Sequence, residues 1–197
     1  MDPIQAQFRA LRKLSGLLQQ DVIAVTKVRN LDPQVKRRSI IRSMFAWIEA
    51  ETFIRKQMAL LLCKKGVTEF SLAELALLNE EQYDIDGQGN ARTRQKFLRL
   101  ADNVKFGIRC ICKATGIDYK VETATDGWQA FVRSIKLGNR ITHPRNLDEL
   151  FITKKDLQDI RGAFNWFLDN VVLIERMFTG KCTAESLRPG ADSTPIP

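Results

Sequence analysis

The chain has 197 residues, of which 44% are hydrophobic and 27% charged, and its formal net charge is +8. This length and composition suit one globular domain with a sizeable core and exclude an intrinsically disordered chain. The longest apolar runs, such as residues 58–63, are too short to span a bilayer, and the first residues lack the layout of a secretion signal. We therefore expect a cytoplasmic protein without a membrane segment.

The first half of the chain has strong helical signals and no sustained β-type alternation. Asp2-Pro3 is an N-cap followed by proline, and it opens a helix to about Lys27. Asp32-Pro33 repeats this signal and begins the longest helix, which should run to Lys65 because Gly66 follows. Its long apolar side makes it the expected core helix.

The second half continues the helical pattern around one acidic stretch. The predicted elements are a capping-box helix at 71–78, a surface loop at 79–90, and helices at 92–114, 128–143 and 153–178. Gly180 should end the last helix. The sequence therefore predicts an all-α fold: a bundle of five or six helices over residues 32–180, an added helical arm over 1–31, and a disordered tail over 181–197.

The cysteines and the distribution of charge indicate which ligands this protein can bind. Cys63, Cys110, Cys112 and Cys182 form no CxxC pair and no zinc spacing, so we expect free, mostly buried thiols and no metal or organic cofactor. Basic residues are concentrated in residues 36–66 and 91–120, whereas the charged residues between 67 and 90 are all acidic. Such a patchy positive surface attracts nucleic acid or anionic lipid, although the solvated faces of amphipathic helices would look the same.

The only histidine, His143, stands at the end of a predicted helix and before Pro144, which disfavours further helix. A helix C-terminus favours the protonated ring, so His143 is expected to be a proton donor. At helical spacing, positions i, i+3, i+4 and i+7 share one stripe, and here these positions are Lys136, Asn139, Arg140 and His143.

The segment GNRITHP, residues 138–144, resembles the signature of HEPN domains (higher eukaryotes and prokaryotes nucleotide-binding), which are small helical bundles. Many HEPN domains carry arginine, a polar residue that is often asparagine, three variable residues and then histidine, near the end of a late helix. Asn139 and His143 fall on the polar and histidine positions, whereas Gly138 stands where the family has arginine. The resemblance covers roughly residues 36–180.

HEPN members with the intact motif are metal-independent ribonucleases that act as dimers with two facing motifs, and they include toxins and phage-defence proteins. The resemblance therefore implies a homodimer that binds RNA. It also implies a role in a toxin–antitoxin or phage-defence system, for example on a mobile element, in which a protein such as an antitoxin would be a partner. His143 would transfer the proton during attack of the 2′-hydroxyl on the phosphate, and Asn139 would orient the phosphate. Arg140 or Lys136 would stabilise the developing charge in place of the missing arginine.

Other interpretations stay open. The same bundle could bind RNA, a nucleotide or a protein without cleavage, or form a structural module of a larger complex. His143 could simply bond the last carbonyls of its helix, and Asn139 could face solvent. The residues expected to contact nucleic acid are Lys136, Arg133, Arg145, Arg37 and Arg38, which could equally be a solvated face.

Two further features have competing interpretations. Glu49, if it faces inward, needs a cationic partner such as Arg133 or Arg140; otherwise it is an exposed rim residue. The three tryptophans have apolar neighbours at helical spacing, which favours core packing or a dimer seam over base stacking.

Overall fold

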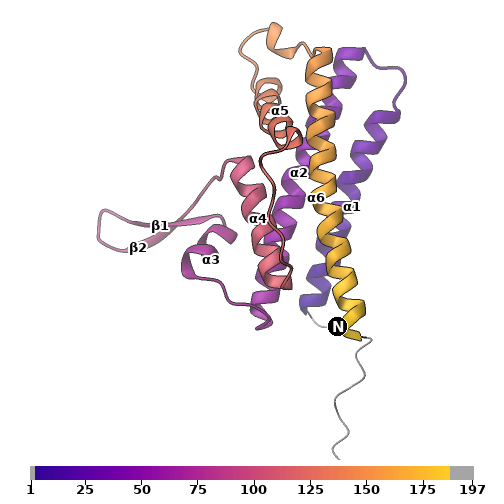
Figure 1. Ribbon diagram of the computed structural model, residues 1–197. Helices are drawn as coiled ribbons and strands as arrows, with labels where there is room; N and C mark the ends of the chain where they lie inside the picture. Colours follow the sequence, from indigo (N-terminus) through magenta and orange to yellow (C-terminus); the bar gives the residue numbers. More distant parts are fainter. Residues whose placement is uncertain (1–2, 187–197) are drawn as a thin grey trace, which may run out of the picture.

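The computed structural model describes residues 3–186, with side chains described for 3–177. It confirms the predicted helical bundle, with a small two-stranded sheet beside it (Figure 1). The elements are α1 (Pro3–Lys27), α2 (Pro33–Lys64), α3 (Leu72–Leu78), β1 (Glu81–Ile85), β2 (Ala91–Gln95), α4 (Leu100–Thr115), α5 (Asp126–Thr142), the 3-10 turn η1 (Asp148–Leu150) and α6 (Lys154–Ser186).

Most helix ends are set by the local signals predicted from the sequence. The Asp32 carboxylate accepts hydrogen bonds from two backbone N–H groups of the first turn of α2, and Ser71 and Glu74 form a reciprocal capping box. The Thr125 hydroxyl caps α5, and Gly116 ends α4 in the left-handed conformation, with φ 63°. Asp2, the predicted cap of α1, lies outside the described residues.

The predicted surface loop at 79–90 forms part of a β-hairpin instead. β1 pairs antiparallel with β2, with Tyr83 opposite Thr93. The Asp86 carboxylate accepts from the backbone N–H groups of Gln88 and Asn90 and thereby organises the turn. Because β2 takes up residues 91–95, the helix predicted from residue 92 begins only at Leu100. Figure 1 shows the hairpin projecting sideways from the bundle.

The predicted end of the last helix is also wrong. α6 continues through Gly180 to Ser186, so residues 181–186 are helical and do not belong to a disordered tail. One glycine inside a long helix costs only about 1 kcal/mol, which the helix tolerates. The rest of the predicted tail, residues 187–197, lies outside the described residues.

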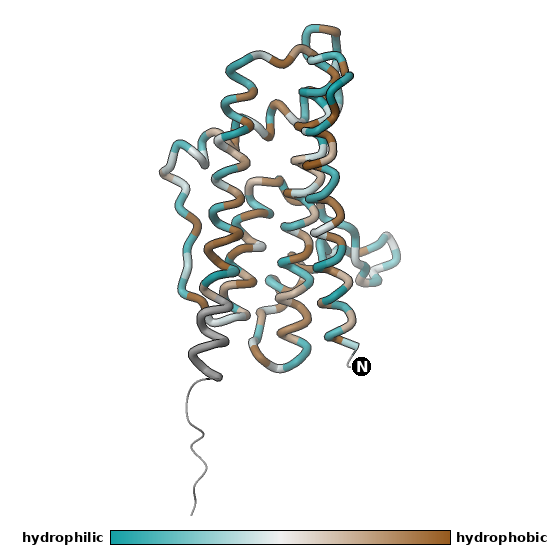
Figure 2. Tube along the Cα trace, turned by 90° about the vertical axis from the view of Figure 1, so that its right-hand side faces the viewer, coloured by the Kyte–Doolittle hydropathy of each residue, from teal (hydrophilic) through white to brown (hydrophobic). Residues whose placement is uncertain are grey.

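α2 is the central helix, as predicted, and it contacts α1, α4 and α5, while the shorter α5 packs against part of α6. Hydrophobic and hydrophilic residues alternate along these helices (Figure 2). All three tryptophans are buried, Trp47 at 3% exposure and Trp128 and Trp166 at 8%, in agreement with core packing. Val22 of α1 joins the same core cluster, so α1 is packed against the bundle.

The hairpin is fixed to the bundle by a buried charge. The Lys56 side chain of α2 is fully buried, and its ammonium donates to the Glu80 carboxylate directly before β1. Glu80 has a φ of 56°, a conformation that non-glycine residues rarely adopt, and its carbonyl accepts from the N–H of Lys96 at 2.6 Å. A buried ammonium requires its partner, so this pair holds the root of the hairpin in place.

Three cysteines lie among the described side chains, and all are free, as predicted: Cys63, Cys110 and Cys112. Burial raises the pKa of Cys110 to about 12 and that of Cys112 to about 11, which keeps both as unreactive thiols. Of the helices in residues 3–186, none combines the length and apolarity that crossing a bilayer requires.

Candidate functional site

A groove of about 1030 Å³ lies between α2, the start of α4 and the C-terminal half of α5. Its walls are partly apolar, with Phe45, Val132 and Ile135 among them. Its charged and amide or imidazole side chains are Arg42, Glu49, Arg99, Lys136, Asn139 and His143. The size and the mixture of apolar wall and converging polar groups are typical of ligand sites.

The groove brings together three of the four residues predicted to form a stripe on α5. Lys136, Asn139 and His143 are exposed and line it. The backbone N–H of His143 donates to the Asn139 carbonyl at 2.9 Å, and α5 ends at Thr142, as Pro144 predicts. Within the described part of the chain, none of these three side chains has a hydrogen-bond or ion-pair partner. All three are therefore available to a ligand.

Arg140, predicted to belong to the stripe, turns away from the groove, and so does Arg133. The Arg140 guanidinium donates to the Phe151 carbonyl at 3.2 Å and lies 3.4 Å from the Asp156 carboxylate. Arg133 binds Asp159 at 2.7 Å, and this hydrogen bond raises the pKa of Arg133. Successive residues of a helix point about 100° apart, so Arg140 faces α6 while Asn139 faces the groove.

The remaining predicted nucleic-acid contacts lie outside the groove. The guanidinium of Arg37 donates to the Ile152 carbonyl and that of Arg38 to the Leu150 carbonyl, each at 3.1 Å. They tie the start of α2 to the connection between α5 and α6. Arg145 is exposed in that connection, and its backbone N–H donates to Glu149 at 2.7 Å.

Arg42 of α2 also lines the groove, although it is not among the site residues predicted from the sequence. Its guanidinium donates to the Ile141 carbonyl at 2.6 Å and so compensates the negative end of the α5 dipole beside His143. Nothing local in the sequence identifies this role, because it depends on α2 and α5 running side by side with residues 42 and 141 in register.

Arg99 adds a second guanidinium to the lining of the groove. It precedes α4, whose first turn has no side-chain cap, and its side chain is exposed and without a partner in the described residues. The uncapped N–H groups of a helix N-terminus carry partial positive charge and favour an anion. The Arg99 guanidinium therefore adds positive charge to the groove, whereas the first turn of α4 also carries the Asp102 carboxylate, which is paired with Lys105.

Gly138, in the C-terminal half of α5, lies directly against α2. A Cβ atom built on Gly138 would stand 2.8 Å from the ring of Phe45. No side chain fits there unless Phe45 moves. The close approach of α5 to α2 thus leaves no room for a larger side chain at position 138 while Phe45 keeps its place.

Glu49 is the one carboxylate among the described groove residues. It is an exposed rim residue, and burial of part of the side chain between apolar neighbours raises its pKa. Neither Arg133 nor Arg140, its candidate partners from the sequence, faces it. It stands seven residues after Arg42, which is about 10 Å along α2.

Within the described side chains, no three histidine, cysteine or acidic residues gather closely enough to hold a metal ion. No family model matches this sequence, and comparisons with the curated proteins and with the solved structures gave no significant match.

Proposed function

We propose that this groove binds the phosphates of single-stranded RNA. The proposal rests on the convergence of five polar side chains in one groove: Arg42, and Lys136, Arg99, Asn139 and His143, which have no partner among the described residues. Three cations face one carboxylate there, so the groove attracts polyanions, and free amide and imidazole groups donate to phosphate oxygens.

The hairpin favours a single strand over a duplex. Tyr83 is 67% exposed and Phe97, between β2 and Arg99, is 85% exposed. Proteins that bind single strands combine a basic groove with aromatic side chains on which bases stack. A strand that leaves the groove past Arg99 would reach these rings.

RNA cleavage by a HEPN-like homodimer is the second candidate function, and the free imidazole of His143 favours it. Attack by a 2′-hydroxyl needs both a base and an acid. One chain offers a single imidazole, which cannot be the base and the acid in the same step. A composite site would therefore need His143 from a second copy, as the resemblance to HEPN ribonucleases implies. If the protein cleaves RNA in this way, it would act in defence, with an antitoxin as its partner.

Binding is tested by fluorescence anisotropy with labelled single-stranded RNA over a series of salt concentrations. Each phosphate contact contributes about 0.7 to the slope of log K against log salt for a single strand. The double variant K136Q/R99Q should lower the slope by about 1.4 and weaken binding roughly 25-fold at 0.1 M salt. A double variant of matched charge, K64Q/K120Q, changes exposed lysines outside the groove and should bind like the unchanged protein. Equal effects of both variants would refute the groove as the site.

Cleavage is tested separately, on the same RNA in EDTA. If the protein is a ribonuclease, the RNA should be cut into products with cyclic phosphate ends, and the His143→Ala variant should form no such products. If the RNA stays intact although the protein binds it in a salt-sensitive way, the protein binds RNA and is not a ribonuclease.

A further inference from the structure

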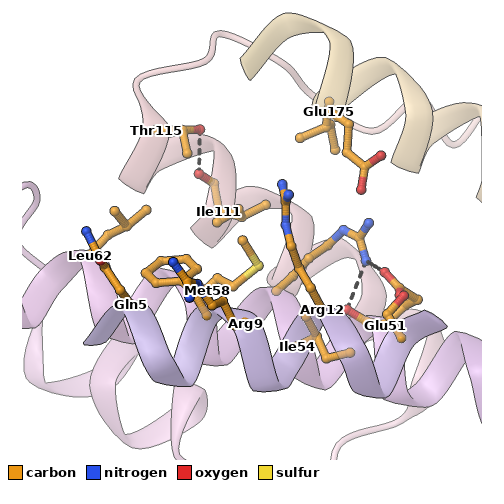
Figure 3. Close-up of a pocket in the computed structure, with 14 residues that line it drawn as sticks. Gln5, Arg9, Arg12, Glu51, Ile54, Met58, Leu62, Ile111, Thr115 and Glu175 are labelled. Carbon is orange, nitrogen blue, oxygen red and sulfur yellow. Dashed lines mark hydrogen bonds and ion pairs between the residues drawn. The ribbon is translucent and has the colours of Figure 1, made fainter. Parts of the chain in front are cut away.

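A second cavity, of about 480 Å³, lies between α1, α2, α4 and α6, away from the groove (Figure 3). Its walls are mainly aliphatic: Ile54, Met58, Leu62, Ile111 and Ile174, with Phe8 as the aromatic member. This volume lies within the range of small-molecule sites. The aliphatic lining suits a flexible hydrocarbon chain better than a flat ring.

The charges deepest in this cavity are already satisfied. The Arg55 guanidinium binds the Glu51 carboxylate at 2.5 Å and the Glu51 carbonyl at 2.9 Å, and the Ser15 hydroxyl donates to the same carboxylate. Glu51 and Arg55 are 5% and 7% exposed. Because this pair compensates itself, it places no demand for charge on a ligand.

The rim of the cavity, in contrast, carries two arginines without partners among the described residues, and the Glu175 carboxylate of α6 lines the same cavity (Figure 3). Arg9 and Arg12 stand three residues apart on α1 and line the opening. Figure 3 shows the Arg12 side chain rising from α1 into the space between the helices. Both residues are exposed, and neither has a hydrogen bond or an ion pair within the described part of the chain. A guanidinium fork of this kind matches a carboxylate.

We propose that this cavity binds a single-chain amphipathic carboxylate, with its hydrocarbon chain between the aliphatic walls and its carboxylate on Arg9 and Arg12. Burial of each methylene contributes about a fourfold gain in affinity, so chain length sets the strength of binding. The charged head group sets its orientation. The site is independent of the RNA groove and does not rest on the proposed function.

The test is isothermal titration calorimetry of the full chain with decanoate, octanoate, decanol and decylamine, all below the concentrations at which they form micelles. Decanoate has two more methylenes and should bind roughly fifteenfold more tightly than octanoate. It should also bind about tenfold more tightly than decanol, and decylamine should bind most weakly. The variant R9Q/R12Q should bind decanoate only as well as decanol, whereas Lys13→Gln, an exposed change on the same helix, should leave the affinity unchanged.

Met58→Trp should fill the cavity and abolish binding of all four compounds, provided that circular dichroism shows unchanged helix content. If Met58→Trp fails to fold, R9Q/R12Q still tests the site, because it changes only exposed side chains. Equal affinity for decanoate and decylamine would refute the anion-binding rim. Decanoate binding that R9Q/R12Q does not weaken would refute this location, and no binding of decanoate would refute the site.

Discussion

The two sides of α5 carry similar polar residues but use them differently. On the side facing α6, Arg133 and Arg140 are bound to Asp159 and Asp156. On the side facing the groove, Lys136, Asn139 and His143 have no partner among the described residues. The first set joins two helices, and the second is open to a ligand.

The difference lies in the neighbouring helices. α6 presents two carboxylates three residues apart, at the spacing of neighbouring positions on a helix face. α2 presents the Phe45 ring, the Arg42 guanidinium and only one carboxylate, Glu49. Equal charge on a helix therefore says little about function until the partner of each charge is known.

Gly138→Ala tests the close approach of α5 to α2. Alanine normally stabilises a helix by about 1 kcal/mol relative to glycine, but contact with Phe45 should cost about 2 kcal/mol here. We expect Gly138→Ala to destabilise the protein, and to stabilise it in the background of Phe45→Ala, giving a coupling of about 2 kcal/mol in urea unfolding. Gly16 in α1 has nothing within 4 Å of an added Cβ and serves as the control that should gain stability. Additive effects of the two changes would contradict the contact.

Asp156→Asn tests the bound side of α5. Burial raises the pKa of Asp156, but hydrogen bonds from Thr153 and the charge of Arg140 outweigh it, so the pKa is lowered overall. The ionised carboxylate therefore stabilises the fold above the unfolded-state pKa, and this contribution is lost as the pH falls through the folded-state pKa. We expect Asp156→Asn to cost about 1 kcal/mol at pH 7 and progressively less toward pH 3, in urea unfolding at each pH.

The control for this change is Asp169→Asn, which alters an exposed carboxylate of α6 without a partner in the described residues. It should show no such dependence on pH. A cost at pH 7 that persists unchanged at pH 3 would exclude the ionised carboxylate as its cause.

Glu49→Gln should make the groove more attractive to RNA. Removal of the one carboxylate should tighten binding about threefold to fivefold in the anisotropy assay. The pKa of Glu49 is raised, so the native state binds a proton more readily than the unfolded chain, and stability falls as the pH rises through the window above 4.5. The glutamine variant should lose this dependence. Glu69→Gln, an exposed change elsewhere, should alter neither property.

Arg133→Gln should have the smallest effect on RNA binding, less than twofold, although it removes the same charge as Arg99→Gln. Its guanidinium is already bound to Asp159 and lies outside the groove. A loss of affinity as large as that of Lys136→Gln would mean that both sides of α5 contact the RNA.

Features that depend on a few neighbouring residues were predictable from the sequence. The caps at Asp32, Ser71 and Thr125 and the stops at Gly66 and Gly116 work through hydrogen bonds and backbone conformations within four residues. The end of α5 before Pro144 and the buried tryptophans follow from the same local rules. The hairpin cannot be predicted in this way, because its strands have five residues each and β2 is exposed throughout, which leaves a weak alternation of hydrophobic and polar residues.

The helical class, most helix ends and the spacing of Lys136, Asn139 and His143 each depend on short stretches of chain, so the amino-acid sequence is enough to predict them. Which charges stay free depends on helix packing, which brings Asp156 and Asp159 beside two arginines, Phe45 against Gly138, and Arg42 to the end of α5. The physical reason is that a charge is available or neutralised according to neighbours in space, and helix packing chooses those neighbours from residues about 15 to 100 positions away.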